Sequence, residues 1–324
     1  MHTDSMLDAL DGLSVGDAVG WEFPLMRGTS VSELPTGTYP AGRWRWTDDT
    51  EMACSVVAEL LTHSCIEQDR LATAFAQRCD PARDYGFATV GNLRQIRDGA
   101  PWREVSAAAF EGRGSCGNGA AMRVAPLGAY FAGDPDRIVA EAIRSAEVTH
   151  MHPEAALGAA AVALAAGHAA QARRTGTRPA PADFLTAILH HLDDSETTRL
   201  IHRAHALLGA STEKAAGELG NGSRVLIQDT VPFTLWAAAT HLHDYPTAIT
   251  TCLEADGDID TTSAITGGIV AAYTGGTPSG IPANWLTARE PLPRWFESAR
   301  QTRQRKPAGF RRISRWLTPR RLDG

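Results

Sequence analysis

Hydrophobic residues along this chain recur mostly at the three- and four-residue spacing of amphipathic helices. Met52, Val56 and Leu60 form one such set, and Ile265 and Ile269 belong to another. No run of segments alternates apolar and polar residues in the way that half-buried strands do. The pattern therefore predicts an all-α protein.

Gly-, Pro- or Asp-rich turns divide the chain into further helical patterns. The Ala-rich stretch from Pro153 to Ala172 has proline at a first-turn position and small residues that permit close packing, so it predicts a buried central helix. Further helices are expected after Thr47 and Asp258 and at 4–15, 70–78, 103–111, 118–131, 135–147, 182–192, 197–208, 231–242 and 246–254.

Composition narrows the class of protein. With 324 residues, 43% of them hydrophobic, the chain has ample material for a core. The N-terminus lacks the basic start and apolar centre of a signal peptide, and no transmembrane segment is expected, so a cytoplasmic location follows. The five cysteines form no C-x-x-C pair, which favours neither a disulfide framework nor a zinc site.

Charge is unevenly distributed. The net charge is −6, although residues 300–324 contain nine Lys or Arg and one Asp. We expect one domain over residues 1–300 and a basic appendage over 301–324. An apolar stripe in the appendage, with Phe310 and Trp316, predicts a docked surface helix. Contact with nucleic acid or an anionic membrane is the alternative.

Two acidic clusters more than 200 residues apart each open a helical pattern: Thr47-Asp48-Asp49-Thr50 and Asp256-Gly257-Asp258-Ile259-Asp260-Thr261. Either cluster alone could be a helix cap, because Thr and Asp are favoured there. Three carboxylates within five positions of the second cluster would repel one another unless exposed or neutralised by a cation. Carboxylate and hydroxyl oxygens suit Mg²⁺ or Mn²⁺. If the clusters share metal ions, they must meet in one domain.

Three other segments carry candidate chemistry. Glu22 sits between two aromatic residues and could act as an acid or base, or be a solvated loop residue. The glycine-rich segment 112–119 could present backbone N–H groups to a phosphate, or be a plain connection. Arg123 could meet that phosphate or pair internally with an acidic side chain. His150 lies just before the Ala-rich helix, where a hydrogen-bonded histidine is commoner than a metal ligand.

Five blocks of sequence, in their order, resemble the ADP-ribosylglycohydrolase family over residues 7–277. They are GDAVGWEF at 16–23, WTDDTEMA at 46–53, GNGAAMRVAPLG at 117–128, THMHPEAALGAA at 149–160 and GDIDTTSAITGGIVAAYTG at 257–275. The resemblance implies an all-α fold with two Mg²⁺ ions, Mn²⁺ being possible, that hydrolyses the bond at C1 of the distal ribose of ADP-ribose.

The resemblance also implies roles for individual residues. Glu22 matches a catalytic or substrate-gating glutamate, and Asp260 a bridging carboxylate that serves catalysis. Candidate substrate-binding residues are Ser115, Gly117, Asn118, Gly119 and His150, and candidate metal ligands are Thr47, Asp48, Asp49, Asp258, Asp260 and Thr261.

The function that follows is removal of ADP-ribose from an ADP-ribosylated protein, with ADP-ribose as the product. Arginine is the expected linkage, by analogy with bacterial members of the family. Alternatives are a serine-linked or nucleic-acid-linked adduct, or a binding or structural protein on the same scaffold.

Overall fold

The computed structural model describes residues 1–25, 43–276, 280–297 and 300. In these residues α-helices are joined by turns and short 3-10 segments. The described residues form isolated β-bridges and no β-strand. This confirms the all-α prediction. The α-helices are α1 (Thr3–Glu22), α2 (Asp48–His63), α3 (Gln68–Arg78), α4 (Phe87–Arg97), α5 (Trp102–Gly112), α6 (Ala125–Tyr130), α7 (Pro135–Glu147), α8 (Pro153–Thr175), α9 (Pro181–Leu189), α10 (Glu196–Ala206), α11 (Thr212–Leu219), α12 (Ile227–Thr240), α13 (Tyr245–Ala255), α14 (Ile259–Thr274) and α15 (Ala283–Ala288).

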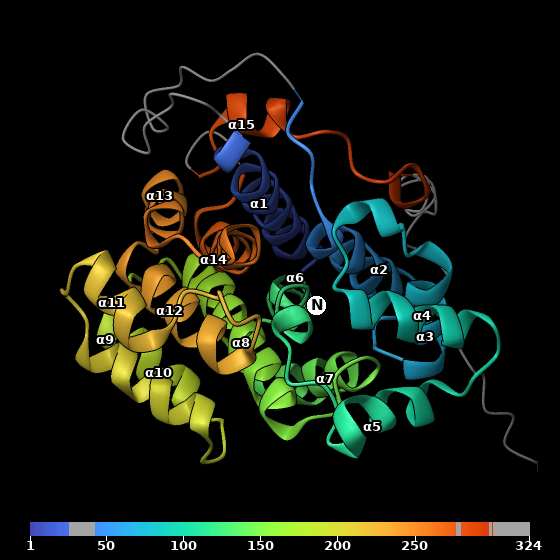
Figure 1. Cartoon of the computed structure of the whole chain (residues 1–324). Helices are drawn as coiled ribbons and strands as arrows, with labels where there is room; N and C mark the ends of the chain where they lie inside the picture. The colour runs from blue at the N-terminus through green and yellow to red at the C-terminus, as the bar shows by residue number, and fades with distance from the viewer. Residues whose placement is uncertain (26–42, 277–279, 298–299, 301–324) are drawn as a thin grey trace, which may run out of the picture.

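Helices α1 and α14 pack closely against each other at the centre of the molecule (Figure 1). Gly12, Gly16 and Gly20 recur every four residues along α1, on the face that meets α14. A Cβ at Gly16 would lie 2.2 Å from the Ser263 carbonyl oxygen, and one at Gly20 would lie 2.5 Å from Asp260 Cα. Only glycine permits such a backbone-to-backbone approach.

The expected end of the first helix near residue 15 was therefore wrong. Helix α1 continues through Gly16 and Gly20 to Glu22. Burial against α14 compensates for the low intrinsic helix propensity of glycine. These two glycines serve helix packing, although in the sequence they resemble a stop signal.

Helix α8 confirms the predicted central helix. It begins with Pro153 in the first turn and ends before Gly176, which has a left-handed φ of 68°. Its alanines are almost all buried, and the neighbouring α6, α7 and α14 pack against it. By length and composition α8 could cross a membrane, but 72% of its apolar window is buried inside the protein, as in a core helix.

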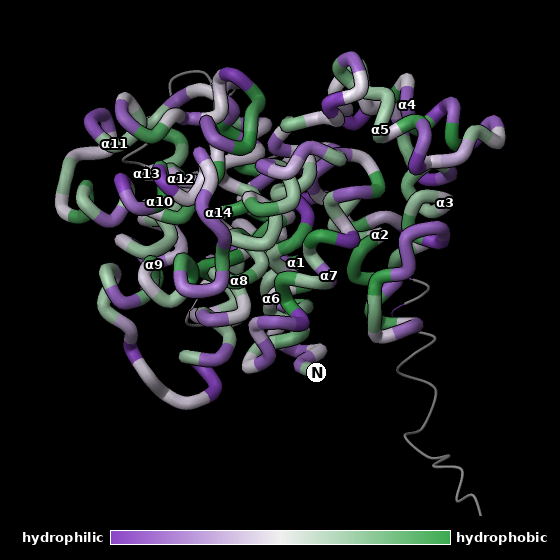
Figure 2. Tube along the Cα trace, turned by 90° about the horizontal axis from the view of Figure 1, so that it is seen from below, coloured by the Kyte–Doolittle hydropathy of each residue, from purple (hydrophilic) through white to green (hydrophobic). Residues whose placement is uncertain are grey.

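Two groups of helices flank this centre in Figure 1, with α2 to α5 on one side and α9 to α13 on the other. Figure 2 shows hydrophobic segments concentrated along the inner helices, while hydrophilic residues follow many of the peripheral turns. The buried apolar side chains from both flanks belong to one continuous core. The two acidic clusters thus lie within a single packed unit.

Several other predicted boundaries differ from the structure. The helix expected at 118–131 is a 3-10 turn at Asn118–Ala120 followed by α6, which restarts with Pro126 in its first turn. In α5 the last turn is distorted, because Phe110 and Glu111 have positive φ. Helices α4, α11 and α15 were not predicted. The basic appendage at 301–324 lies outside the described residues.

Candidate active site

A cluster of carboxylates forms where α1, α2 and α14 meet. Asp17 of α1, Asp49 of α2 and Asp260 of α14 each offer an oxygen, and these three atoms lie within 4.8 Å of one another. Asp17 and Asp49 are buried, and Asp260 is partly buried. Residues from opposite ends of the chain therefore converge in the manner that the metal hypothesis requires.

Asp17 holds the start of α2 against α1. Its carboxylate accepts hydrogen bonds from the backbone N–H and hydroxyl of Thr47, at 3.0 and 2.9 Å, and from those of Thr50, at 3.1 and 2.5 Å. Burial raises the pKa of Asp17 to about 6, while these hydrogen bonds act in the opposite direction. Asp17 was not among the predicted ligands.

The acidic clusters do not act as simple helix caps. Thr47 is the N-cap of α2 and Asp258 that of α14, yet neither side chain makes a capping hydrogen bond. The single hydrogen of the Thr47 hydroxyl instead lies between two carboxylates, with an Asp17 oxygen at 2.9 Å and an Asp49 oxygen at 3.0 Å. The side chains of Thr47 and Asp258 are thus available for a role other than capping.

The electrostatics of the cluster favour a cation. Burial raises the pKa of Asp48, Asp49 and Asp260 well above the usual value for each group, and the neighbouring carboxylates raise it further. Asp49 Oδ1 is buried without a hydrogen-bond partner among the described residues. A hard divalent cation would neutralise these charges and use this oxygen, so the residues fit a metal site.

The remaining predicted ligands lie beside this cluster. Asp48, Asp258, Asp260 and Thr261 line a cavity of about 760 Å³. Repulsion from the Asp258 carboxylate raises the pKa of Asp48 and of Asp49, and Asp48 raises the pKa of Asp49 in the same way. Asp260 belongs both to the carboxylate cluster and to the cavity wall. The structure thus brings the two acidic segments together at one end of the cavity.

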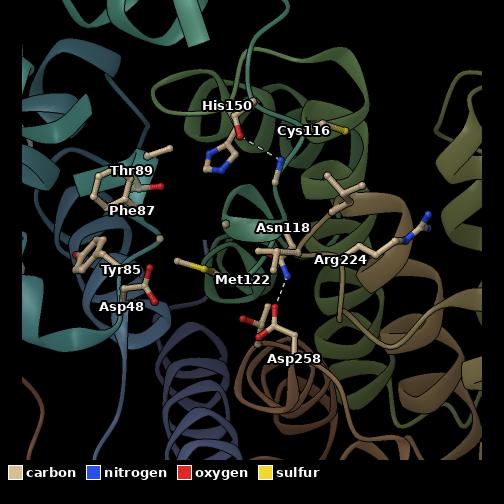
Figure 3. A pocket seen from close by; sticks show the side chains of 18 of the residues that line it. Asp48, Tyr85, Phe87, Thr89, Cys116, Asn118, Met122, His150, Arg224 and Asp258 are labelled. Carbon is tan, nitrogen blue, oxygen red and sulfur yellow. Dashed lines mark hydrogen bonds between the residues drawn. The ribbon is translucent and has the colours of Figure 1, made fainter. Parts of the chain in front are cut away.

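The glycine-rich segment forms another part of the wall. All the predicted substrate-binding residues line the cavity: Ser115, Gly117, Asn118, Gly119 and His150. In Figure 3, Asp48 and Tyr85 lie on one side of the view, and Asn118 and Asp258 on the other. The six described residues 84–89 complete the wall opposite the glycine-rich segment.

Hydrogen bonds join Asn118 of the glycine-rich segment to residues from two other parts of the chain. The Asn118 N–H donates to the Val225 carbonyl at 3.2 Å. The Asn118 side-chain amide donates to Asp258 at 2.6 Å and to Thr230 at 3.1 Å (Figure 3). Asn118 therefore connects this segment to the acidic end of the cavity.

Glu22 lies at the C-terminal end of α1 and is not part of the main cavity wall. Its carboxylate accepts a hydrogen bond from the Arg45 N–H at 3.2 Å. Its neighbours Trp21 and Pro24 line a smaller hollow of about 270 Å³ that also reaches Asp260. Residues 26–42, which follow, lie outside the described part of the chain. The catalytic role of Glu22 stays a prediction.

Both sequence-based interpretations of Arg123 were wrong. Its side chain is fully buried and does not line the cavity. One terminal nitrogen donates to the Ser145 carbonyl at 2.7 Å and to the Thr149 hydroxyl at 2.9 Å. Within the described part of the chain, Arg123 therefore neither lines the cavity nor forms an ion pair with a carboxylate.

Sequence reasoning also missed the apolar rim of the cavity. Phe87, Phe110, Val225 and Leu226 are large hydrophobic residues that are exposed and line the cavity. Phe87 is 97% exposed, although it begins a helix. In the sequence, Phe87, Val225 and Leu226 are apolar residues outside the predicted helices, and Phe110 is near the end of the helix predicted at 103–111. Single exposed apolar residues are common and need no special function.

Known proteins resemble this chain over most of its length. A profile of the family described as ADP-ribosylglycohydrolase matches residues 2–309. The proteins called ADP-ribosylhydrolase ARH3 of Xenopus tropicalis and Homo sapiens are each 29% identical, covering 76% and 81% of this chain and 77% and 78% of their own lengths. Uncharacterized protein YegU of Escherichia coli strain K12 is 28% identical over 85% of this chain and 89% of its own.

A solved structure supports the same fold. It is titled "ADP-ribosylglycohydrolase-related protein complex", and it has a TM-score of 0.55 and a sequence identity of 24%. The match covers 93% of this chain and 96% of that chain.

Proposed function

Because this chain belongs to the ADP-ribosylglycohydrolase family, we propose that it is a Mg²⁺-dependent hydrolase that removes ADP-ribose from a modified target. One observation carries the proposal: Asp260 is shared by the carboxylate cluster and by the wall of a cavity large enough for a ligand of this size. A metal held there would face the bound substrate.

Binding of ADP-ribose is assigned to the wall that contains the glycine-rich segment. Gly117 and Gly119 leave room for a ligand to approach the backbone, and anionic phosphate groups are suited to backbone N–H donors. His150 lies above these glycines, since a Cβ on Gly117 would be 3.1 Å from its Nε2. Ser115 and Asn118 complete the proposed diphosphate and ribose contacts.

The metal site is assigned to Asp17, which joins the predicted ligands Thr47, Asp48, Asp49, Asp258, Asp260 and Thr261. Bound Mg²⁺ would supply Lewis acidity and an anchor for ribose hydroxyls. Asn118 holds the Asp258 carboxylate by a 2.6 Å hydrogen bond, and the Thr47 hydroxyl lies between the carboxylates of Asp17 and Asp49, at 2.9 and 3.0 Å. These bonds orient the carboxylates before substrate enters, as a preorganised site requires.

Glu22 is the proposed proton donor. Cleavage of a glycosidic bond passes through an oxocarbenium-like state, and the leaving group needs a proton. Glu22 would release a proton to the leaving atom or assist the attacking water. Its position at the end of α1, beside a hollow that reaches Asp260, supports this role.

The proposed linkage is to arginine. Asp84 is not among the assigned ligands, yet it lines the same cavity as Asp48 and Asp258. An additional carboxylate favours a cationic guanidinium over the neutral oxygen of a serine adduct. Serine-linked ADP-ribose is the alternative substrate.

Release of free ADP-ribose from matched arginine- and serine-modified peptides tests the proposal. Each reaction is run with Mg²⁺ and with excess EDTA, using wild type, Asp258→Asn and the control Asp256→Asn. Asp256 is exposed and does not line the cavity, and Asn has the same shape as the native Asp, so the substitution removes the charge alone.

We expect EDTA-sensitive release from the arginine peptide by wild type and Asp256→Asn, with at least a hundredfold loss in Asp258→Asn. Release from the serine peptide alone would contradict the arginine linkage and favour the serine linkage. Tight ADP-ribose binding without release from either peptide would replace the hydrolase with a binding protein.

A further inference from the structure

A buried chain of hydrogen bonds runs from Arg123 to the ring of His150. Arg123 Nη2 has two hydrogens, and both have acceptors: the Ser145 carbonyl at 2.7 Å and the Thr149 hydroxyl at 2.9 Å. The Thr149 hydroxyl lies 2.7 Å from His150 Nδ1. Arg123, Thr149 and His150 are 0%, 6% and 5% exposed, respectively, so bulk water does not compete for these bonds.

The direction of the last bond follows from the chemistry of the first. A guanidinium has donors and no acceptor, so the Thr149 oxygen must accept from Arg123. The Thr149 hydroxyl hydrogen is then free to donate to His150 Nδ1. In the opposite arrangement Arg123 and His150 would both point hydrogens at one oxygen, which is the less favourable geometry electrostatically.

We propose that Arg123 and Thr149 are positioning residues that hold His150 as the Nε2–H tautomer, so that this N–H donates to an oxygen of the ligand bound at the glycine-rich segment. The inference rests on the proposed function for the identity of that ligand, an ADP-ribosyl group. Arg123 and Thr149 act through His150 and touch no ligand themselves.

The surroundings of His150 support this assignment. With Nδ1 accepting from Thr149, a neutral ring carries its proton on Nε2. Cβ atoms added to Gly117 and Gly119 would lie 3.1 and 3.2 Å from Nε2, so this nitrogen faces the backbone of the glycine-rich segment. Figure 3 shows the His150 ring directed toward the space between the labelled walls.

The charge of Arg123 adds a second effect. Burial lowers the pKa of His150 to about 3, and Arg123 lowers it as well. The ring therefore stays neutral at physiological pH and presents one donor of fixed direction. Burial of the Arg123 guanidinium without an ion-pair partner among the described residues is unfavourable. Control of the His150 tautomer is a role that accounts for a guanidinium at this position.

The tautomer can be observed directly in the free protein. We would record long-range ¹H–¹⁵N correlation spectra of protein labelled with ¹⁵N-histidine and identify His150 by the signals lost in His150→Gln. Thr149→Val removes the hydroxyl and keeps the shape, whereas Thr149→Ser keeps the hydroxyl. ADP-ribose affinity is measured for the same proteins by calorimetry.

We expect the Nε2–H tautomer in wild type and Thr149→Ser, and mixed tautomers in Thr149→Val. Affinity for ADP-ribose should fall roughly tenfold in Thr149→Val and be retained in Thr149→Ser, because one directed hydrogen bond is lost. Arg123→Met should also give mixed tautomers, and a folded Arg123→Met protein that keeps the Nε2–H form would overturn the role of Arg123 and leave that of Thr149.

An Nδ1–H tautomer in wild type would overturn the inference, as would unchanged tautomer and affinity in Thr149→Val. Failure of the proposed function looks different: wild type would bind no ADP-ribose, while its spectrum still showed the Nε2–H form. That result would leave the positioning chain in place and remove only the ligand assigned to it.

Discussion

Replacing Gly20 with alanine should damage the carboxylate cluster through packing alone. The new Cβ would lie 2.5 Å from Asp260 Cα and 2.7 Å from Asp260 N. Nonbonded carbons approach to about 3.5 Å, so α1 and α14 must separate by about 1 Å at this point. A functional constellation tolerates about 0.5 Å. The substitution therefore exceeds the tolerance of the site without changing any ligand.

The effect on stability combines two terms of opposite sign. Overpacking lowers the free energy of unfolding by about 1–3 kcal/mol, and the higher helix propensity of alanine raises it by about 1 kcal/mol. Two controls separate packing from site geometry. Gly217→Ala meets no atom within 4 Å in α11 and should be neutral or stabilising, while Gly12→Ala clashes with Gly267 and Ala271, far along α14 from Asp260.

The assay is thermal unfolding with Mg²⁺ or EDTA. At a Mg²⁺ concentration a hundred times the wild-type Kd, bound ion stabilises by about 2.7 kcal/mol, and a hundredfold weaker site would retain about 0.4 kcal/mol. We expect Gly12→Ala to keep the Mg²⁺ response and Gly20→Ala to lose most of it. A full Mg²⁺ response in a destabilised Gly20→Ala protein would refute the link between helix packing and the metal site.

Three further predictions address individual side chains. Asp49→Asn should remain folded in EDTA, because it removes a repelled buried charge, yet lose the Mg²⁺-induced rise in Tm; a wild-type rise would contradict the assignment. Because the folded pKa of His150, about 3, lies below the unfolded 6.5, the unfolded chain binds the proton first and stability falls as pH drops below about 6.5. In urea unfolding, wild type should lose about 2 kcal/mol relative to His150→Gln between pH 7.5 and pH 5, and parallel pH profiles would show that the ring is not buried in the neutral form. Glu22→Gln should retain ADP-ribose affinity in calorimetry and lose turnover, whereas equal loss of both would argue for a binding role.

Local sequence identifies candidate site residues where the polar groups are contiguous in the chain. The clusters at 47–50 and 256–261 could be recognised as metal-binding candidates because their oxygens are adjacent in the chain, and the structure brings both segments to one cavity. The glycine-rich segment and His150 were recognised in the same way, and residues 113–119 and His150 line that cavity.

Asp17 could not be identified in this way, because its environment depends on long-range packing. Read alone, Gly16 and Gly20 indicate the end of a helix, and an aspartate between them resembles a turn residue. Only the crossing of α1 with α14 turns Asp17 toward Asp49 and Asp260. The same missing information explains both the wrong helix end and the missed carboxylate.

Arg123 illustrates a second limit. An arginine after a glycine-rich segment favours a phosphate contact from sequence, since arginine is rarely buried without a carboxylate. Its actual partners, the Ser145 carbonyl and the Thr149 hydroxyl, lie on and after α7. Their position depends on how α7 packs beside the segment, which no local pattern specifies.

The most direct test of the central claim is the rate of ADP-ribose release from a modified peptide as free Mg²⁺ is varied, for wild type and Asp260→Asn. Release should rise from background to a plateau as Mg²⁺ is restored to chelated wild-type protein, with no such rise in a folded Asp260→Asn protein. Equal release with and without Mg²⁺, or an unaffected Asp260→Asn protein, would contradict it.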